Sequence, residues 1–180
     1  MKYIVLLRGI NISGKNIISM KSLKEEIELL GYKNVITYLN SGNIILESED
    51  NENNIENNIY NMIVNKFKLN IPIFIIEENK LKELINNKPN WWMTGNKEIY
   101  DNIIFIISPR TYNEIYNSLG MPNEKLEKIK EYKNNIFWSY SLKDYRKTNW
   151  WSKTASTDIK DYITIRIGNT VTKLLKLCDK

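Results

Sequence analysis

The order of hydrophobic patterns along residues 3–76 constrains the fold more than any other feature of the sequence. Four short runs have the length and β-branched content of strands, at residues 3–7, 35–39, 44–46 and 71–76. Two further segments place apolar residues at helical spacing, the first with Leu23, Ile27 and Leu30 and the second with Ile55, Ile59, Met62, Ile63 and Phe67. The resulting order is β-α-β-β-α-β, which is that of the ferredoxin-like, or split βαβ, unit.

The pattern of residues 87–180 is less regular. Strands are expected at residues 102–107, 136–140 and 162–166. Helices are expected at residues 81–85, after a capping box formed by Thr111 and Glu114, around Leu126, Ile129 and Tyr132, and at residues 171–178. We therefore predict an α+β protein. A ferredoxin-like half spans residues 1–86, and a smaller, less regular α/β half spans residues 87–180 and packs on it as one compact unit.

The residue types that are missing or rare exclude several kinds of chemistry. The chain has no histidine, so it has no Ser-His-Asp or Cys-His machinery and no imidazole metal ligands. Its single cysteine, Cys178, cannot form a disulfide within the chain and is expected to pack as a small apolar residue on a helix. We predict no metal site and no cofactor.

The charge and the apolar segments bear on partners and location. The net charge is +5, from 26 Lys and Arg against 21 Asp and Glu, and no dense basic block occurs. This mild excess permits an anionic partner without requiring one. The apolar run at residues 3–7 is too short for a signal peptide, and no segment approaches the roughly 20 apolar residues of a membrane helix. We expect a cytoplasmic protein without membrane segments.

A glycine-containing loop follows the first strand. Gly9, four further residues and Gly14-Lys15 nearly match the Walker A pattern of nucleotide-binding proteins. However, Asn16 replaces the Ser or Thr that would hold magnesium, and the next helix starts too late for a P-loop. These departures from the Walker A pattern favour a role for the loop other than nucleotide hydrolysis.

The predicted fold brings this loop close to a second polar segment. In a β-α-β-β-α-β unit, the end of the first strand and the hairpin tip at residues 40–43 lie on one edge of the sheet, where the first helix also begins. The polar residues expected there are Arg8, Asn11, Lys15, Asn40, Ser41 and Asn43. Backbone N–H groups, a helix dipole and cations suit a phosphate or carboxylate, so we predict an anion site at this edge. A cluster of polar loops with only a structural role is the alternative.

A third polar motif precedes the last predicted helix. Residues 164–170 place Arg166, Gly168 and Asn169 between a strand and that helix. Capping of the helix explains Asn169 and Thr170 but leaves Arg166 unexplained. Arg166 and Asn169 are therefore included among the candidate ligand-binding residues.

Two other functions remain open at this point. An enzyme without histidine would have to use Lys15 and Arg8 in an unknown reaction. Nucleic-acid binding would use Trp150 and Trp151, which lie between the basic residues Arg146, Lys147 and Lys153. Packing within the fold is the alternative role for these two tryptophans.

Several of the segments described above match a known family, and the two N-terminal polar motifs agree with it in order and spacing. The chain resembles the bacterial family catalogued as domain of unknown function 1697. The matching segments are residues 8–11, 14–16, 37–38, 41–43, 164–166, 169–171 and 173–175, with Met20 and Leu23. Members of the family commonly have Gln where Asn40 stands in this chain. The resemblance implies an α+β fold with a ferredoxin-like part and implies no particular activity.

Overall fold

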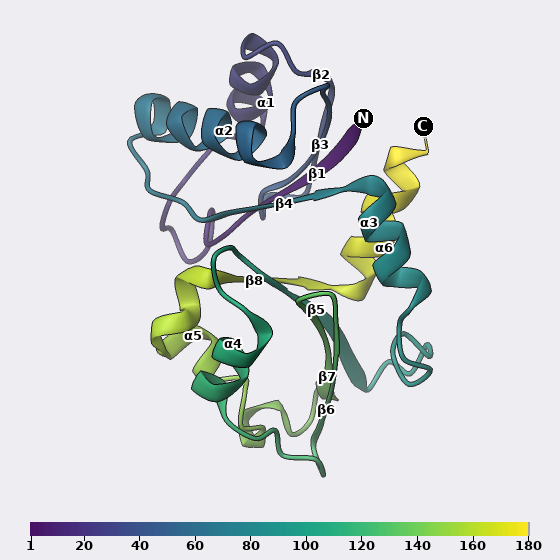
Figure 1. Ribbon diagram of the computed structural model, residues 1–180. Helices are drawn as coiled ribbons and strands as arrows, with labels where there is room; N and C mark the ends of the chain where they lie inside the picture. The colour runs from purple at the N-terminus through teal and green to yellow at the C-terminus, as the bar shows by residue number, and fades with distance from the viewer. Residues whose placement is uncertain (180) are drawn as a thin grey trace. The chain divides into compact units, whose positions relative to one another are not determined.

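The computed structural model describes residues 1–179, and its first 77 residues form the predicted β-α-β-β-α-β order (Figure 1). The elements are β1 (Lys2–Leu7), α1 (Met20–Leu29), β2 (Lys33–Tyr38), β3 (Asn43–Glu47), α2 (Glu52–Phe67) and β4 (Ile73–Glu77). The strands form one antiparallel sheet in the order β2-β3-β1-β4. The structure thus confirms the predicted order of elements. The order could be predicted because each strand and each helix has the apolar period that its type requires.

The position of each strand follows from its composition. β1 is buried on both faces from Tyr3 to Leu7 and lies between β3 and β4, with Val5 opposite Ile44 on one side and Ile75 on the other. β2 is an edge strand, is half-exposed and carries a register irregularity between Lys33 and Ile36. A bulge and a lysine are features by which natural sheets discourage pairing at an edge.

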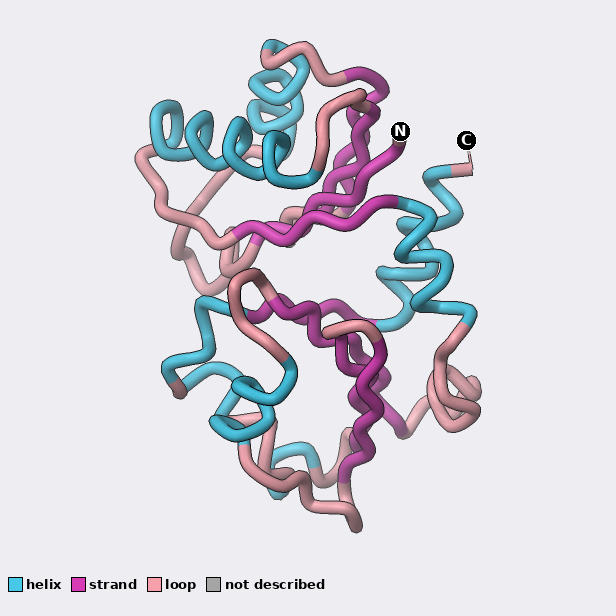
Figure 2. Tube along the Cα trace, viewed as in Figure 1, coloured by secondary structure: helices cyan, strands magenta, loops and turns pink. Residues whose placement is uncertain are grey.

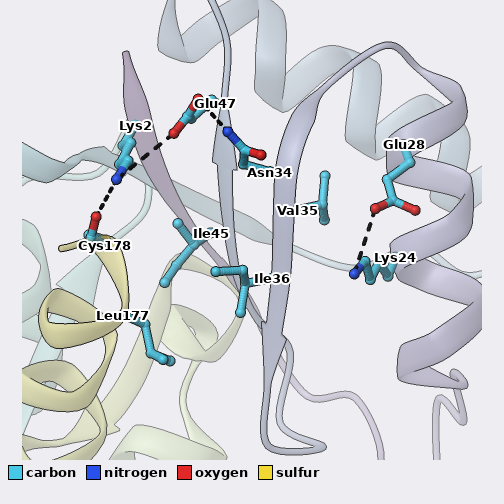
Figure 3. A pocket seen from close by; sticks show the side chains of 10 residues that line it. All are labelled: Lys2, Lys24, Glu28, Asn34, Val35, Ile36, Ile45, Glu47, Leu177 and Cys178. Carbon is cyan, nitrogen blue, oxygen red and sulfur yellow. Dashed lines mark hydrogen bonds and ion pairs between the residues drawn. The ribbon is translucent and has the colours of Figure 1, made fainter. Parts of the chain in front are cut away.

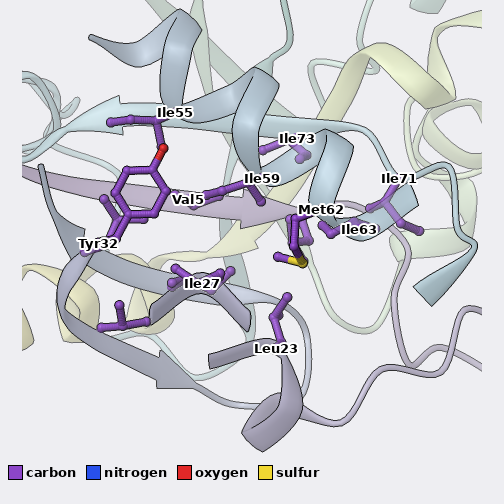
Figure 4. Packing of buried hydrophobic residues seen from close by; sticks show 14 of the residues in the cluster. Val5, Leu23, Ile27, Tyr32, Ile55, Ile59, Met62, Ile63, Ile71 and Ile73 are labelled. Atoms are coloured by element: carbon purple, nitrogen blue, oxygen red, sulfur yellow. The ribbon is translucent and has the colours of Figure 1, made fainter. Parts of the chain in front are cut away.

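Helices α1 and α2 lie on the same side of this sheet (Figures 1 and 2). Their apolar stripes meet the strands in a core that includes Leu23 and Ile27 from α1, Ile59 and Ile63 from α2, and Val5 from β1 (Figure 4). The helices have identifiable ends: the Ser19 and Asn51 side chains accept hydrogen bonds from the first turns of α1 and α2. Such caps each contribute about 1 kcal/mol to helix stability.

The second half of the chain repeats the same strand topology. Its elements are α3 (Glu78–Asn86), β5 (Ile99–Ile106), α4 (Tyr112–Leu119), β6 (Glu127–Tyr132), β7 (Asn135–Ser141), α5 (Lys153–Ser156), β8 (Ile163–Ile167) and α6 (Gly168–Cys178). The sheet is antiparallel with the order β6-β7-β5-β8, so its first strand is again central and its second strand again lies at an edge. Two short 3-10 helices, at Tyr145–Lys147 and Asp158–Tyr162, flank α5 where the first half has the long helix α2.

The segment around Leu126, Ile129 and Tyr132 is a strand, so the prediction of a helix there was wrong. Residues Glu127–Tyr132 pair with β7, and Ile129 lies opposite Trp138. Glu127 is buried and accepts hydrogen bonds from Trp138 Nε1 at 3.0 Å and from the backbone N–H groups of Asn123 and Asn149 at 2.8 and 2.7 Å. Because the charged Glu127 lies on the buried face, the segment lacks the alternation of apolar and polar residues that would identify a strand in the sequence.

Aromatic residues dominate the core of the second half. Trp138 and Trp150 are buried with Ile115 and Leu119 of α4. The two indole rings lie 6.3 Å apart, and Tyr116 contacts Trp150 edge-on. The predicted capping box of α4 is confirmed, since Thr111 and Glu114 exchange side-chain and backbone hydrogen bonds.

The chain divides into two compact units. The first contains Met1–Lys82 together with Lys173–Lys180, and the second contains Glu83–Thr172. Helix α6 begins at Gly168, earlier than predicted, and its C-terminal turns belong to the first unit. Within that unit, Lys2 donates a hydrogen bond to the carbonyl of Cys178, and Lys82 Nζ contacts Asp179 at 3.1 Å. Among residues 1–179, no helix combines the length and apolar character needed to cross a bilayer.

Candidate functional site

The loop between β1 and α1 has an unusual density of left-handed backbone conformations. Positive φ angles occur at Gly9, Asn11, Ser13, Gly14 and Asn16, between +48° and +76°. Glycine and asparagine tolerate this region better than other residues. The glycine and asparagine residues of the loop therefore match the backbone conformation that it adopts before α1 begins.

Asn11 holds this loop in place. Its Nδ2 donates to the carbonyls of Ile18 and Asn40, both at 2.9 Å, and its Oδ1 accepts from the Ile18 N–H at 2.9 Å. The Asn11 N–H also donates to the Asn16 carbonyl at 3.1 Å. One side chain thus joins the loop of residues 8–19 to the hairpin tip at residues 40–43, two of the segments that the sequence placed at one edge of the sheet.

The hairpin tip packs directly on the end of β1. The Leu7 N–H donates to the Gly42 carbonyl at 2.8 Å. Asn43 is buried, and its Nδ2 donates to the Tyr38 carbonyl at 2.9 Å and to Ser41 Oγ at 3.0 Å. Asn43 therefore shapes the turn, and Ser41 is held beside it.

A pocket of about 500 Å³ opens between the two segments. Its lining residues are Asn11, Gly14, Ile17, Ile18, Ser19, Met20 and Asn40. Two of them, Asn11 and Asn40, were predicted from the sequence. Four lining residues were not predicted: Ile17, Ile18, Ser19 and Met20. In the sequence, this stretch indicates only that a helix is about to begin.

Among residues 1–179, no charged side chain lines this pocket, and the cations of the segment differ in their pairing. Residues 1–24 contain Lys2, Arg8, Lys15, Lys21 and Lys24 and no acidic residue, but Lys2, Lys21 and Lys24 pair with Glu47, Glu25 and Glu28 at 3.9, 3.9 and 3.7 Å. Lys15 is exposed and follows the pocket residue Gly14 directly. α1 has no acidic residue in its first turn, where the helix dipole is positive. The site thus offers a helix N-terminus with the exposed Lys15 nearby in the sequence, and no carboxylate of the described residues lines the pocket itself.

The loop is not a P-loop. The Lys15 N–H donates to the Ile12 carbonyl at 2.9 Å, which closes a tight turn within the loop. Met20 starts the helix five positions after Lys15, whereas a P-loop enters its helix at the lysine. The exposed position of Lys15 also favours a role as a simple cation over one as a desolvated nucleophile.

The remaining candidate residues have other surroundings. Arg8 is half-buried, and its backbone N–H donates to the Pro72 carbonyl at 3.0 Å. Arg166 lies in the second unit, where it is buried and donates from one guanidinium nitrogen to Thr164 Oγ1 at 2.8 Å and to the Ile165 carbonyl at 2.9 Å. Asn169 lines a pocket of about 370 Å³ within the second unit, together with Gly95, Asn96 and Lys97.

A pocket of about 480 Å³ in the first unit lies beside the edge strand β2 (Figure 3). Its charged side chains are already paired: Lys2 with Glu47 at 3.9 Å and Lys24 with Glu28 at 3.7 Å. Burial raises the pKa of the Cys178 thiol in its wall to about 11, and the charge of Glu78 acts in the same direction. This cysteine is therefore a packed thiol and lacks the low pKa of a reactive one.

The tryptophans proposed for nucleic-acid binding differ in accessibility. Trp150 is buried and its Nε1 donates to the Gly120 carbonyl at 2.8 Å, so its ring is unavailable for stacking on bases. Trp151 is 40% exposed and contacts the Tyr145 ring edge-on at 4.7 Å. Among residues 1–179, no group of three or more His, Cys, Asp or Glu side chains has the arrangement of a metal site.

Comparison with known proteins places the chain in a family. The family model described as "Protein of unknown function (DUF1697)" matches residues 1–137. The chain belongs to this family. The match includes the whole loop pocket and every candidate site residue except Arg166 and Asn169.

A solved structure of the conserved bacterial protein SP0830 from Streptococcus pneumoniae is similar over nearly its full length. The sequence identity is 25%, the TM-score is 0.84, and the alignment covers 98% of this chain and 97% of that one. This likeness agrees with the mixed α+β fold. None of the curated proteins matches the chain.

Proposed function

We propose that this protein is a cytoplasmic binding protein for a phosphate-bearing or otherwise anionic small molecule. The ligand occupies the pocket between the loop of residues 8–16 and the turn of residues 40–43. The observation that carries the proposal is that the pocket lies at the N-terminus of α1 and is lined by amide, hydroxyl and aliphatic groups without a carboxylate.

Two further features support this ligand class. The loops that form the pocket are fixed to each other by Asn11, so the shape of the pocket is set before a ligand arrives. Preorganisation of this kind lowers the conformational cost of binding. Lys15 adds positive charge within the same segment, which favours an anion over a neutral ligand.

Substitution of the helix cap provides the test. Ser19 caps α1 and lines the pocket, and both Asp and Asn are good N-cap residues. We expect Ser19→Asp to keep or increase the melting temperature while weakening phosphate binding by about tenfold or more, because it adds a negative charge to the pocket wall. Ser19→Asn, which caps without charge, should bind phosphate within about twofold of the wild type.

The measurement is calorimetric titration with inorganic phosphate at low ionic strength. Lys15→Gln should also weaken binding, whereas Lys160→Gln, at an exposed lysine in the second unit, should not. Equal affinities for Ser19→Asp and Ser19→Asn would contradict an anion site at this pocket.

A further inference from the structure

Two aromatic rings and one arginine of the second unit form a cluster at its surface. Trp151 is 40% exposed and meets the half-buried Tyr145 edge-on, with the ring centroids 4.7 Å apart and the ring planes 72° apart. Arg146 lies over the same tyrosine ring, 5.4 Å from its centroid, and its Nε donates to the Tyr145 hydroxyl at 2.8 Å. We refer to Tyr145, Arg146 and Trp151 as the aromatic–arginine cluster.

Thr148 fixes the backbone that carries this cluster. Its side chain is buried, and its Oγ1 donates to the Tyr145 carbonyl at 2.7 Å and accepts from the Trp151 N–H at 3.3 Å. Tyr145 and Arg146 also belong to the 3-10 helix Tyr145–Lys147. The spacing of the two rings is therefore set before a partner binds, which lowers the conformational cost of binding.

The indole of Trp151 retains surface for a second ring. Because the two rings are nearly perpendicular, Tyr145 does not stack face to face on Trp151. Trp138 and Trp150, by contrast, are buried in the core of the second unit. A partly exposed tryptophan that its neighbours hold in place provides a platform on which a planar base can stack.

The segment beside the indole carries cations that are only partly neutralised. The 3-10 helix and the two residues before it contain three cations and one carboxylate, Asp144, which pairs with Lys147 at 2.8 Å. Glu124 lines a pocket with Asp144, and two lysines line the same pocket. Lys143 and Arg146 are exposed, and within residues 1–179 neither forms an ion pair. The guanidinium of Arg146 can therefore receive an external anion.

We infer that the aromatic–arginine cluster binds single-stranded nucleic acid, with one base stacked on Trp151 and a phosphate of the same strand held by Arg146. A strand presents bases and phosphates side by side, so one partner occupies the indole and the guanidinium together. A duplex does not fit, because its bases are stacked on each other and cannot reach an indole. The binding surface lies wholly in the second unit, so the inference does not depend on the proposed anion pocket of the first.

Strands with and without bases test the stacking contact. Fluorescence anisotropy with the full-length protein compares a labelled oligothymidylate of about 12 nucleotides with an abasic strand of the same length and backbone. The wild type should bind the oligothymidylate more tightly by about fivefold or more, the lower limit for one stacked base. Trp151→Ala should bind both strands with nearly equal affinity, and Trp151→Phe should keep a preference. Tyr60→Ala is the control, because Tyr60 is a 37% exposed aromatic residue of the first unit.

A salt titration tests the phosphate contact. Arg146→Gln should weaken binding of both strands alike and should reduce the slope of log affinity against log salt by about 0.7, the value for one phosphate of a single strand. Arg110→Gln should leave the slope unchanged, because Arg110 is already paired with Glu114 at 3.0 Å. Oligouridylate and oligodeoxyuridylate differ at the sugar 2′-hydroxyl, so the tighter of the two assigns the surface to RNA or to DNA.

Three results would overturn the inference. The first is equal affinity of the wild type for the oligothymidylate and the abasic strand, or no binding of either. The second is an unchanged preference in Trp151→Ala. The third is displacement of the labelled strand by polyglutamate as effectively as by unlabelled oligothymidylate, which would assign the surface to an acidic peptide.

Discussion

Asn11 shows how much of the candidate site depends on single side chains. Its amide joins residues 29 positions apart in sequence, and its own backbone is in the left-handed region at φ +54°. Aspartate would keep the acceptor and the tolerated backbone but lose both donated hydrogen bonds. The left-handed backbone conformation and the donated hydrogen bonds both favour asparagine at this position. For this reason Asn11 could be recognised in the sequence as part of a polar motif.

Gly42 and Gly14 form a matched pair for testing the packing of the hairpin tip. Both have φ +76°, but a Cβ at Gly42 would lie 2.7 Å from Leu7 Cβ, whereas a Cβ at Gly14 would meet nothing within 4 Å. We expect Gly14→Ala to lower the free energy of unfolding by about 1 kcal/mol through backbone strain alone. Gly42→Ala should lower it by about 3 kcal/mol or more, since the overlap is added to the strain. Urea titrations of the two variants provide the comparison, and equal losses would show that the tip can move away from Leu7.

At the scale of elements, β6 is the strand that the sequence pattern predicted wrongly as a helix. Spacings of three residues between Leu126, Ile129 and Tyr132 fit a helix, and the sequence offered no reason to count Glu127 as buried. Its burial depends on three N–H donors, two of which come from loops outside the strand. Local periodicity cannot reveal partners that arrive from elsewhere in the chain, so this strand was beyond prediction from its own pattern.

Replacement of Glu127 by glutamine should therefore be costly despite its similar shape. The amide can accept only through its oxygen, so an NH2 group would face either Trp138 Nε1 or two backbone N–H donors. We expect Glu127→Gln to lower the free energy of unfolding by about 2–3 kcal/mol. Lys128→Gln, on the exposed face of the same strand, should change it by less than about 0.5 kcal/mol. Similar effects of both variants in urea unfolding would argue against the buried carboxylate.

At the scale of the whole molecule, the two units share one strand topology although only the first was predicted in detail. The first unit was predictable because its strands and helices are separated by polar turns and follow simple periods. In the second, short 3-10 and α-helical segments replace a long helix, and the core depends on tryptophans whose partners are distant in sequence. Of the residues that line the loop pocket, Asn11 and Asn40 were predicted from the polar motifs, whereas Ile17 and Met20 carry no polar signal in the sequence that would mark them as pocket residues.

The buried tyrosines make a prediction about alkaline pH. Burial raises the pKa of Tyr140 to about 12 and is also the largest cause of the raised pKa of Tyr3, Tyr32 and Tyr112. Their stabilising contribution is complete below the unfolded value of 10 and is lost as pH rises towards the folded values, because only the unfolded chain ionises freely there. Each such group contributes a loss of up to about 1.4 kcal/mol per pH unit.

Urea unfolding between pH 9 and 11.5 measures this loss. The free energy of unfolding should be nearly constant at the lower end and fall steeply above pH 10, and Tyr140→Phe should fall less steeply than the wild type. A profile of Tyr140→Phe parallel to that of the wild type would show that Tyr140 ionises as readily in the folded protein as in the unfolded chain.

Because the last turns of helix α6 belong to the first unit, the two units receive their final residues at different times during synthesis. The first unit includes residues 173–180, and the whole of the second unit lies between Lys82 and that segment. While the chain emerges from the ribosome, the second unit can therefore acquire all its residues before the first unit does. The core of the N-terminal sheet lies within residues 3–73, so the sheet can fold first, but its contacts with the last turns of α6, such as that of Lys2 with Cys178, can form only after the second unit has been synthesised.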